Sequence, residues 1–236
     1  FTRKDGVRSR EDIIACNLDQ VIAVQSFYMP QLNLRFVDRI IARSNKGNIP
    51  VLLCINKADL MGKGDRNYVR LYYKGTDIRI QIVSALTGSG IDSFKKEVAG
   101  KRSLLIGYSG VGKSSLFNRI YPGIDLKVNE VSETSGKGRH TTTNVKMIRA
   151  EDGTELIDTP GVREFGLVDI EPDDLGNCFN DFREASHNCR FRPCTHDHEP
   201  GCEVKRMVEE GIIHEDRYIS YLNILYSIQE NIRNMY

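Results

Sequence analysis

Eight residues near the middle of the chain have the pattern G-x-x-x-x-G-K-S and run from Gly107 to Ser114. Glycines at this spacing let successive backbone N–H groups turn inward, where a following helix N-terminus adds its own unpaired donors. Lys113 would contact the β- and γ-phosphates of a polyphosphate, and the Ser114 hydroxyl would ligate Mg²⁺. The pattern predicts a phosphate-binding loop, whose nucleotide-contacting residues are Gly107, Tyr108, Ser109, Gly110, Val111, Gly112, Lys113, Ser114 and Ser115.

A second polar motif, Asn56-Lys57-Ala58-Asp59, has the form N-K-x-D and directly follows an apolar run. The Asp59 carboxylate can accept the N1 and N2 hydrogens of guanine, a pair of donors that adenine lacks. The Asn56 amide can hold the loop and contact the base edge, while the aliphatic stem of Lys57 lies over the purine face. Alone, the motif is also a common turn at a strand end. Beside a phosphate loop it predicts guanine specificity.

Ser84-Ala85 follows the next apolar run of the chain, residues 78–83. A backbone N–H at this position can donate to guanine O6, a contact that the amino group of adenine would reject. We therefore expect Ser84 and Ala85 to complete the base site.

Magnesium and γ-phosphate contacts are expected after the phosphate loop. Asp158-Thr159-Pro160-Gly161 fits D-x-x-G, in which the Asp158 carboxylate would hold Mg²⁺ and the Gly161 N–H would contact the γ-phosphate. A plain turn is the alternative for this motif. A loop threonine, Thr141 or Thr142, would add a hydroxyl ligand to Mg²⁺. His140 either orients the attacking water or is an ordinary solvated loop histidine.

Four of the six cysteines are crowded between Cys178 and Cys202, which favours a metal site over disulfides. Three thiolates and one imidazole would form a closed tetrahedral, structural zinc site. The expected ligands are Cys189, Cys194, His196 and Cys202. His187 and His198 are rival ligands, and His196 is preferred because it stands beside Cys194. Cys178 lies too far upstream and is expected to be packed.

Short apolar runs would position these motifs. Each run suits a strand buried on both faces of a parallel sheet, and each delivers a polar loop at its C-terminal end. The expected strands are 20–26, 50–55, 78–83 and 103–106, followed by a hairpin of 144–150 with 154–157. Helices are expected after Pro30, around 91–99 and after the phosphate loop, and the segment 129–144 is expected to be a mobile loop. The fold class is therefore α/β, a mostly parallel sheet with helices on both faces.

Composition excludes one class of protein and leaves others open. The longest apolar run, 51–55, is far shorter than the roughly 20 residues of a membrane-spanning helix, so no membrane association is expected. The net charge of +1 is too small to require a nucleic-acid partner.

With 236 residues, the chain is long enough for a full α/β domain and a smaller one. Residues 1–10 are expected to be a linker from a preceding segment, 11–175 a nucleotide-binding domain and 176–236 a helical zinc-binding domain. In the last of these, an apolar stripe from Tyr218 to Ile232 recurs at helical spacing and is expected to pack.

The motifs occur in the order base, base, phosphate loop, magnesium loop, γ-phosphate loop. In this order the chain resembles the circularly permuted GTPases, and with the cysteine cluster it is similar to the family of the ribosome small-subunit-dependent GTPase A. The resemblance spans residues 11 to about 225, and the spacing to His196 agrees with the zinc site of that family. It implies a P-loop GTPase domain, bound GTP or GDP with Mg²⁺, and one structural Zn²⁺.

The resemblance also implies an N-terminal OB-fold domain and action in late maturation of the small (30S) ribosomal subunit. The implied partners are that subunit and its rRNA, and a cytoplasmic monomer is expected. Val162 stands where many GTPases carry a water-positioning glutamine, so intrinsic hydrolysis should be slow unless the subunit or His140 supplies the missing group. The alternatives are a P-loop kinase or ATPase, and a nucleotide-gated RNA-binding scaffold with little turnover.

Overall fold

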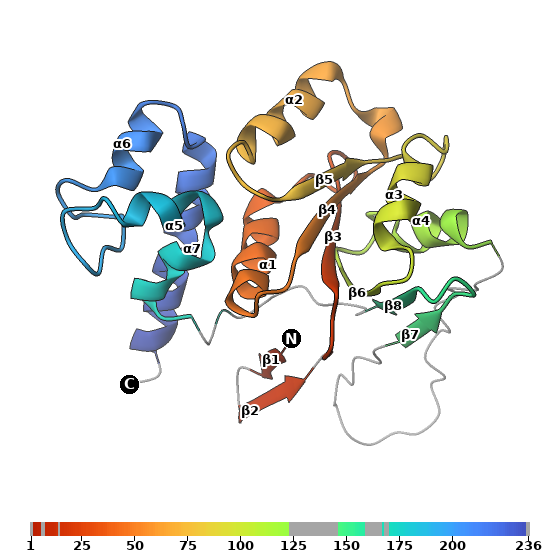
Figure 1. The fold of residues 1–236 in the computed structure, drawn as a ribbon, viewed down its shortest axis with the longest axis horizontal. Coiled ribbons are helices and arrows are strands. Elements are labelled where there is room, and N and C mark those ends of the chain that lie inside the picture. Colours follow the sequence, from red (N-terminus) through yellow and green to blue (C-terminus); the bar gives the residue numbers. More distant parts are fainter. Residues whose placement is uncertain are drawn as a thin grey trace.

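The computed structural model describes residues 2–5, 8–13, 15–122, 146–158, 167 and 170–234. Within these residues, six strands form one sheet in the order β5-β4-β3-β6-β8-β7 (Figure 1). The strands are β3 (Gln20–Ser26), β4 (Val51–Asn56), β5 (Arg79–Ile82), β6 (Arg102–Ile106), β7 (Lys146–Arg149) and β8 (Glu155–Asp158). All the strands expected from the apolar runs are therefore present.

Five of the six strands run parallel, and β7 alone pairs antiparallel, with β8. The central strand β3 pairs with β4 from Val21↔Val51 to Ser26↔Asn56, and with β6 from Gln20↔Ser103 to Ala23↔Ile106. The carboxyl ends of β3, β4, β5, β6 and β8 consequently meet at one edge of the sheet. That edge is where open α/β sheets bind ligands.

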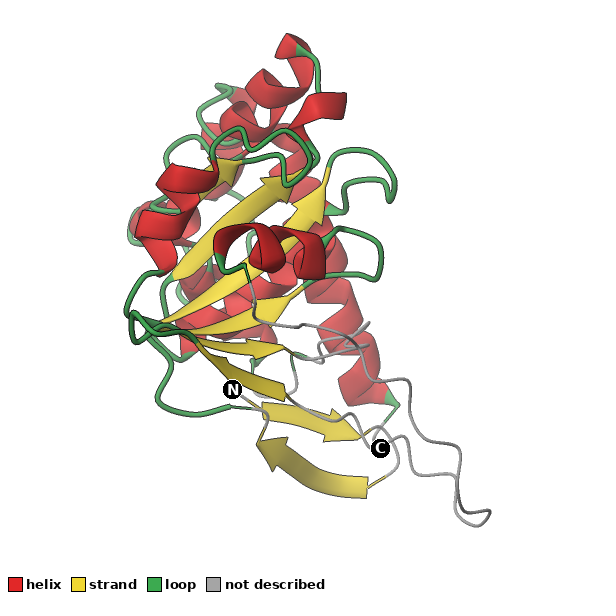
Figure 2. Ribbon diagram, turned by 90° about the vertical axis from the view of Figure 1, so that its right-hand side faces the viewer, coloured by secondary structure: helices red, strands yellow, loops and turns green. Residues whose placement is uncertain are grey.

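Helices cover both faces of the sheet, as the turned view shows (Figure 2). Alternate residues of β4 point to opposite cores. Leu53 and Ile55 pack with α1 (Leu34–Lys46) and α2 (Lys63–Tyr72), whereas Leu52 and Cys54 pack with α3 (Ile91–Val98) and α4 (Lys113–Ile120). The predicted fold class is confirmed.

The first helix begins later than expected. Pro30 belongs to the preceding loop, and α1 starts at Leu34 after the cap residue Asn33, whose side-chain oxygen accepts a hydrogen bond from the Phe36 N–H at 3.0 Å. An Asn cap satisfies one of the unpaired N–H groups of a first turn, a stronger start signal than proline. Helix α2 was not anticipated.

Residues expected to form a polar linker contain two strands. β1 (Thr2–Asp5) and β2 (Arg8–Ile13) pair antiparallel, from Thr2↔Ile13 to Asp5↔Arg8, apart from the six-stranded sheet. A ladder is made by backbone N–H and C=O groups, so a charged sequence without apolar alternation can still form one. The pairing adds local structure to the expected linker, and both the linker and the domain boundaries remain predictions.

A helical unit follows the sheet. It comprises the 3₁₀ segment η2 (Pro172–Cys178), α5 (Asn180–Ser186), α6 (Glu203–Glu209) and α7 (Glu215–Arg233), around a core that includes Phe179, Phe182 and Tyr221. Cys178 is buried in this core, as expected. Along the predicted stripe of α7, Tyr221, Leu225 and Ile228 are buried, and Tyr218, Leu222 and Ile232 pack partly buried against them.

A buried charge network joins the helical unit to the sheet unit. Arg217 of α7 is 1% exposed and donates to Asp38 of α1 at 2.8 Å and to both oxygens of Asp181 of α5, at 2.5 and 2.8 Å. The hydroxyls of Tyr72 and Tyr73 also donate to Asp38, at 2.6 and 3.1 Å. Burial alone would lower the pKa of Arg217, but the two carboxylates more than offset this and the pKa is raised.

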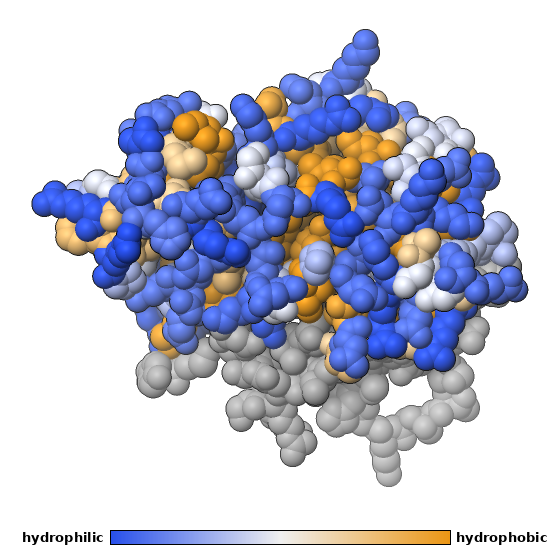
Figure 3. All heavy atoms as spheres, in the orientation of Figure 1, coloured by the Kyte–Doolittle hydropathy of each residue, from blue (hydrophilic) through white to orange (hydrophobic). Residues whose placement is uncertain are grey.

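Polar side chains cover most of the face seen in Figure 3, with apolar patches between them. Among the described residues, no helix is both long and apolar enough to cross a bilayer.

Candidate functional site

Asn56, the last residue of β4, joins three loops at the carboxyl edge of the sheet. Its side-chain oxygen accepts from the Ala85 N–H at 3.0 Å, and its amide nitrogen donates to the carbonyls of Val111 at 3.0 Å and Gly112 at 3.4 Å. The residue is 2% exposed. The structure thus brings together the N-K-A-D, Ser84-Ala85 and phosphate loops, and the Asn56 amide is occupied in holding them.

Asp59 lies beside Ser84 at the same edge. The buried Ser84 hydroxyl donates to Asp59 Oδ1, and its oxygen accepts from the Thr87 N–H at 3.1 Å. The Ala58 N–H donates to the Val83 carbonyl at 2.9 Å, which fixes the turn. Because Asp59 is exposed, its remaining lone pairs are available to a donor such as a guanine edge.

Lys57 has a left-handed backbone (φ 61°), and its ammonium group donates to the Met29 carbonyl. Met29 is 74% exposed and lies in the loop between β3 and α1. Pro30, the next residue of this loop, lies 3.8 Å from the position of a Cβ added to Gly110 of the phosphate loop. Sequence reasoning missed this loop as part of the site because Pro30 was assigned to a helix.

The phosphate loop leaves β6 at Gly107 and enters α4 at Lys113. A Cβ on Gly107 would be 2.2 Å from the Val24 carbonyl, so only glycine fits there. The Lys113 ammonium donates to the carbonyls of Gly107 at 2.6 Å and Tyr108 at 3.3 Å. Burial lowers the pKa of Lys113, and attraction to Asp158 partly offsets this. Phosphate oxygens would compete for this cation.

Gly112 is held in a conformation that other residues rarely adopt. Its φ is +88°, and an added Cβ would be 2.5 Å from the amide nitrogen of Asn56. Its carbonyl accepts from the Leu116 N–H at 2.9 Å, which begins α4, with Ser114 and the exposed Ser115 in the first turn.

Tyr108 connects the phosphate loop to α1. Its ring stacks on Phe36, with centroids 4.4 Å apart and planes inclined by 30°, and its hydroxyl accepts from the Asn33 side chain at 3.3 Å. The pattern G-x-x-x-x-G-K-S offered no signal for this contact, because Tyr108 occupies a variable position of the motif.

Asp158 ends β8 and lies in register with Leu105 of β6, which precedes the phosphate loop. It is close enough to Lys113 for their charges to interact. The other residues predicted to contact magnesium, γ-phosphate or water lie outside the described residues: His140, Thr141, Thr142 and Gly161. The predicted loop 129–144 also lies outside them.

The four predicted metal ligands meet in one cluster. Their ligand atoms lie within 4.8 Å of one another, and Cys189, His196 and Cys202 are buried. His196 Nδ1 lies 3.7 Å from Cys189 Sγ and 3.4 Å from Cys202 Sγ. Its Nε2 lies 3.0 Å from Ser186 Oγ, which in turn donates to the Phe182 carbonyl at 2.7 Å. Nε2 is therefore the donor, and Nδ1 keeps a lone pair directed at the cluster.

The rival histidines take no part in this cluster. His187 and His198 are exposed, and His198 Nδ1 lies 3.9 Å from Asp197. Burial raises the pKa of the Cys194 thiol to about 12 and lowers that of His196. A raised pKa favours the neutral thiol, whereas a bound cation would favour the thiolate. Three sulfurs and one imidazole are a set of donors that fits tetrahedral Zn²⁺.

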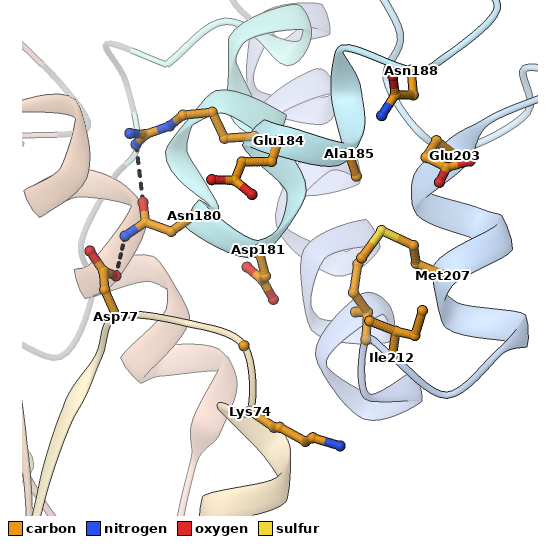
Figure 4. A pocket seen from close by; sticks show the side chains of 13 residues that line it. Lys74, Asp77, Asn180, Asp181, Glu184, Ala185, Asn188, Glu203, Met207 and Ile212 are labelled. Atoms are coloured by element: carbon orange, nitrogen blue, oxygen red, sulfur yellow. Dashed lines mark hydrogen bonds between the residues drawn. The ribbon is translucent and has the colours of Figure 1, made fainter.

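A cavity of about 520 Å³ lies between the loop after α2 and helices α5 and α6 (Figure 4). Asn180 donates to Asp77 across it and accepts from Arg183 at 3.0 Å. None of the predicted site residues that the structure describes lines this cavity.

Comparison with known proteins shows the family of this chain. Residues 1–168 match the family model described as RsgA GTPase. The chain is 39% identical to the small ribosomal subunit biogenesis GTPase RsgA 2 of Bacteroides thetaiotaomicron, and 40% identical to RsgA of Phocaeicola vulgatus. Each alignment covers 97% of this chain and 74% of the relative.

Solved structures show the same fold. The crystal structure of YjeQ from Thermotoga maritima superposes with a TM-score of 0.76 at 36% identity, covering 90% of this chain and 72% of that one. YloQ, described as a circularly permuted GTPase, superposes with a TM-score of 0.71 at 26% identity, covering 97% and 78%. The fold is thus that of the circularly permuted GTPases, and the chain belongs to the RsgA GTPase family.

Proposed function

We propose that this GTPase acts in the cytoplasm as an assembly factor in late maturation of the small ribosomal subunit, binding that subunit and its rRNA as a monomer. The names of its relatives support the assembly role. The observation that carries the nucleotide site is the set of hydrogen bonds by which Asn56 holds two base-binding loops and the phosphate loop together.

Each of the predicted site residues has a separate proposed role in binding GTP and Mg²⁺. Asp59, positioned by Ser84, would accept the guanine N1 and N2 hydrogens, and the stem of Lys57 would cover the base. Lys113 would exchange its two loop carbonyls for phosphate oxygens. Ser114 and Asp158 would hold Mg²⁺, which when bound neutralises the charge that develops on the phosphates. His140, Gly161 and a threonine, Thr141 or Thr142, remain proposed contacts. Val162 cannot orient water, so we expect slow hydrolysis by the free protein.

Asp59→Asn should change nucleotide preference in phosphate release stimulated by small ribosomal subunits. The asparagine donates where guanine also donates but where the O2 of xanthine accepts, so GTP binding should weaken about 10- to 100-fold and xanthosine triphosphate should become the better substrate. The measurement is phosphate release with each nucleotide, with and without subunits, together with ATP as competitor.

Asp92→Asn serves as the control, because Asp92 is an exposed carboxylate on α3 that is not among the predicted site residues. An unchanged preference for GTP in Asp59→Asn would remove Asp59 from the base site. If small subunits did not accelerate phosphate release by the unmodified protein, that result would contradict the assembly role. Inhibition of GTP hydrolysis by ATP would favour an ATPase.

We also propose that the Cys₃His cluster holds one structural zinc ion. Cys202→Ser should lose stoichiometric zinc and destabilise residues 176–236, because metal binding replaces part of a small hydrophobic core. Guanine nucleotide binding should largely survive. Metal content per chain is the measurement, and Cys178→Ser is a matched control, since Cys178 is buried in the same core outside the cluster. Full zinc occupancy in Cys202→Ser would show that the ligands are wrongly assigned.

A further inference from the structure

The start of α2 takes no part in the proposed contacts with GTP, but it holds the turn that would make them. The Arg66 guanidinium donates to the Ala58 carbonyl at 3.0 Å, in a half-buried contact. Ala58 stands between Lys57 and Asp59, the two residues proposed to contact the guanine, and its N–H donates to the Val83 carbonyl at 2.9 Å. Arg66 therefore fixes the other polar group of the same peptide turn.

A second residue of α2 is connected to the ammonium end of Lys57. Lys57 donates to the Met29 carbonyl, and the hydroxyl of the preceding residue, Tyr28, donates to the Asp65 carboxylate with both oxygens at 3.2 Å. One of these oxygens also accepts from the Gly62 N–H at 2.9 Å, which holds Asp65 at the start of the helix. One tyrosine side chain therefore ties the acceptor of the Lys57 ammonium to α2.

The loop between β3 and α1, which contains this tyrosine, is closed by its own hydrogen bonds. The Ser26 hydroxyl donates to the Pro30 carbonyl at 2.9 Å, and the Leu32 N–H donates to the Phe27 carbonyl at 3.2 Å. The rings of Phe27 and Tyr28 pack edge to face, with centroids 5.0 Å apart. Because the loop has little freedom within itself, the position of the Tyr28 hydroxyl determines where the next carbonyl lies.

We propose that Tyr28 and Arg66 are positioning residues of the guanine site. Tyr28 sets the point at which the Lys57 ammonium is anchored, and Arg66 holds the turn that carries Lys57 and Asp59. A lysine stem has many rotamers, so it covers a purine face without a large loss of entropy only when its head is already fixed. Neither positioning residue would touch the nucleotide. The inference rests on the proposed contacts of Lys57 and Asp59 with guanine.

Tyr28→Phe tests the anchor of Lys57. Loss of the hydroxyl should weaken GTP binding about 2- to 10-fold, the range for one net hydrogen bond. Inosine triphosphate, which lacks the N2 amino group, should lose the same factor, because a stem over the ring face does not distinguish the two bases. Calorimetric titration with each nucleotide is the measurement. In phosphate release with small subunits, the same factor should appear in KM rather than in kcat.

A double-mutant cycle separates positioning from a general loss of stability. Lys57→Met keeps an apolar stem but has no ammonium to anchor, so adding Tyr28→Phe to it should not weaken GTP binding further. Tyr226→Phe is the matched control, because Tyr226 is 46% exposed on α7 and its hydroxyl also donates to an aspartate, Asp197, at 2.8 Å. This control should bind GTP as tightly as the unmodified chain.

Arg66→Gln tests the turn. Because Ala58 precedes Asp59, a loosened turn should also misplace the carboxylate that would accept the N2 hydrogen. GTP affinity should therefore fall more than inosine triphosphate affinity, and the ratio of the two should drop about 2- to 10-fold. Arg66→Lys should restore most of the ratio, since an ammonium can still donate to the carbonyl. Arg70→Gln removes the same charge from an exposed position of α2 and should leave the ratio unchanged.

Two outcomes would overturn the inference: a loss of GTP affinity from Tyr28→Phe that is equally large with and without Lys57→Met, or a ratio in Arg66→Gln equal to that in Arg70→Gln. Failure of the proposed function has a different signature, because an unmodified chain that bound ATP as tightly as GTP would have no guanine site to position.

Discussion

Gly112→Ala is expected to lower GTP affinity by about 100-fold or more while the sheet remains folded. The left-handed backbone conformation costs an alanine about 1–2 kcal/mol relative to its preferred conformations. The alanine Cβ would also lie 2.5 Å from the Asn56 amide nitrogen. Asn56 must then give up its bond to the Val111 carbonyl, a loss of about 1–3 kcal/mol for a buried group. That bond joins the proposed base loops to the phosphate loop. Without it, the protein would no longer hold the guanine and the phosphates of GTP at the same time in the correct relative position.

Titration with a fluorescent GTP analogue measures the effect. Gly153→Ala is the matched control, because Gly153 has a similar φ of +81° in the β7–β8 turn but no atom within 4 Å of an added Cβ. It should lose stability without losing GTP affinity. Equal GTP affinities in the two variants would mean that contact with Asn56 is unimportant.

Arg217→Ala is expected to reduce the free energy of unfolding by about 3–5 kcal/mol, because it leaves the buried carboxylates of Asp38 and Asp181 without their cation. The guanidinium also stacks between two rings, 4.8 Å from the Phe179 centroid and 5.2 Å from that of Tyr73. Removing the guanidinium should weaken the packing of α1 against α7. It should also destabilise the sheet unit and the helical unit individually.

Urea denaturation measures this change in unfolding free energy. Arg206→Ala removes an exposed arginine with two ion pairs and should cost no more than about 1 kcal/mol. Combining Asp38→Asn with Arg217→Met should recover part of the loss, since one unpaired charge is then absent. A change in Arg217→Ala as small as that in Arg206→Ala would show that the network contributes little.

The elements that could be predicted from the sequence are those in which every residue has the same surroundings, such as a strand that is buried along its whole length. Strands β3 and β4 are buried at every position and so read as apolar runs. The meeting of Cys189, Cys194, His196 and Cys202 in one cluster was predictable from their spacing, because the closed zinc site proposed for them requires four donors close together. Spacing did not exclude His187 and His198, since their exposure depends on how the loop folds.

Other features depend on contacts distant in sequence. Helix α2 buries only Val69 and Tyr72, too few apolar residues for a clear helical period. Arg217 is one of the largest fully buried side chains, yet its partner Asp38 is 179 residues away, and an arginine on a helix is normally read as solvated. The same holds for Asn56, whose motif indicates a base contact but whose bonds to Val111 and Ala85 appear only in three dimensions.

The pairing of β3 with both β4 and β6 has a consequence for synthesis on the ribosome. Translation delivers β4 soon after β3, but β6 only after α2, β5 and α3. At about 5–20 residues per second, the nascent chain carries one unpaired edge of an apolar strand for several seconds. Such an edge is a template for pairing with another chain. The permuted order therefore makes the base-binding half first and leaves its central strand exposed to aggregation until the phosphate-binding half emerges.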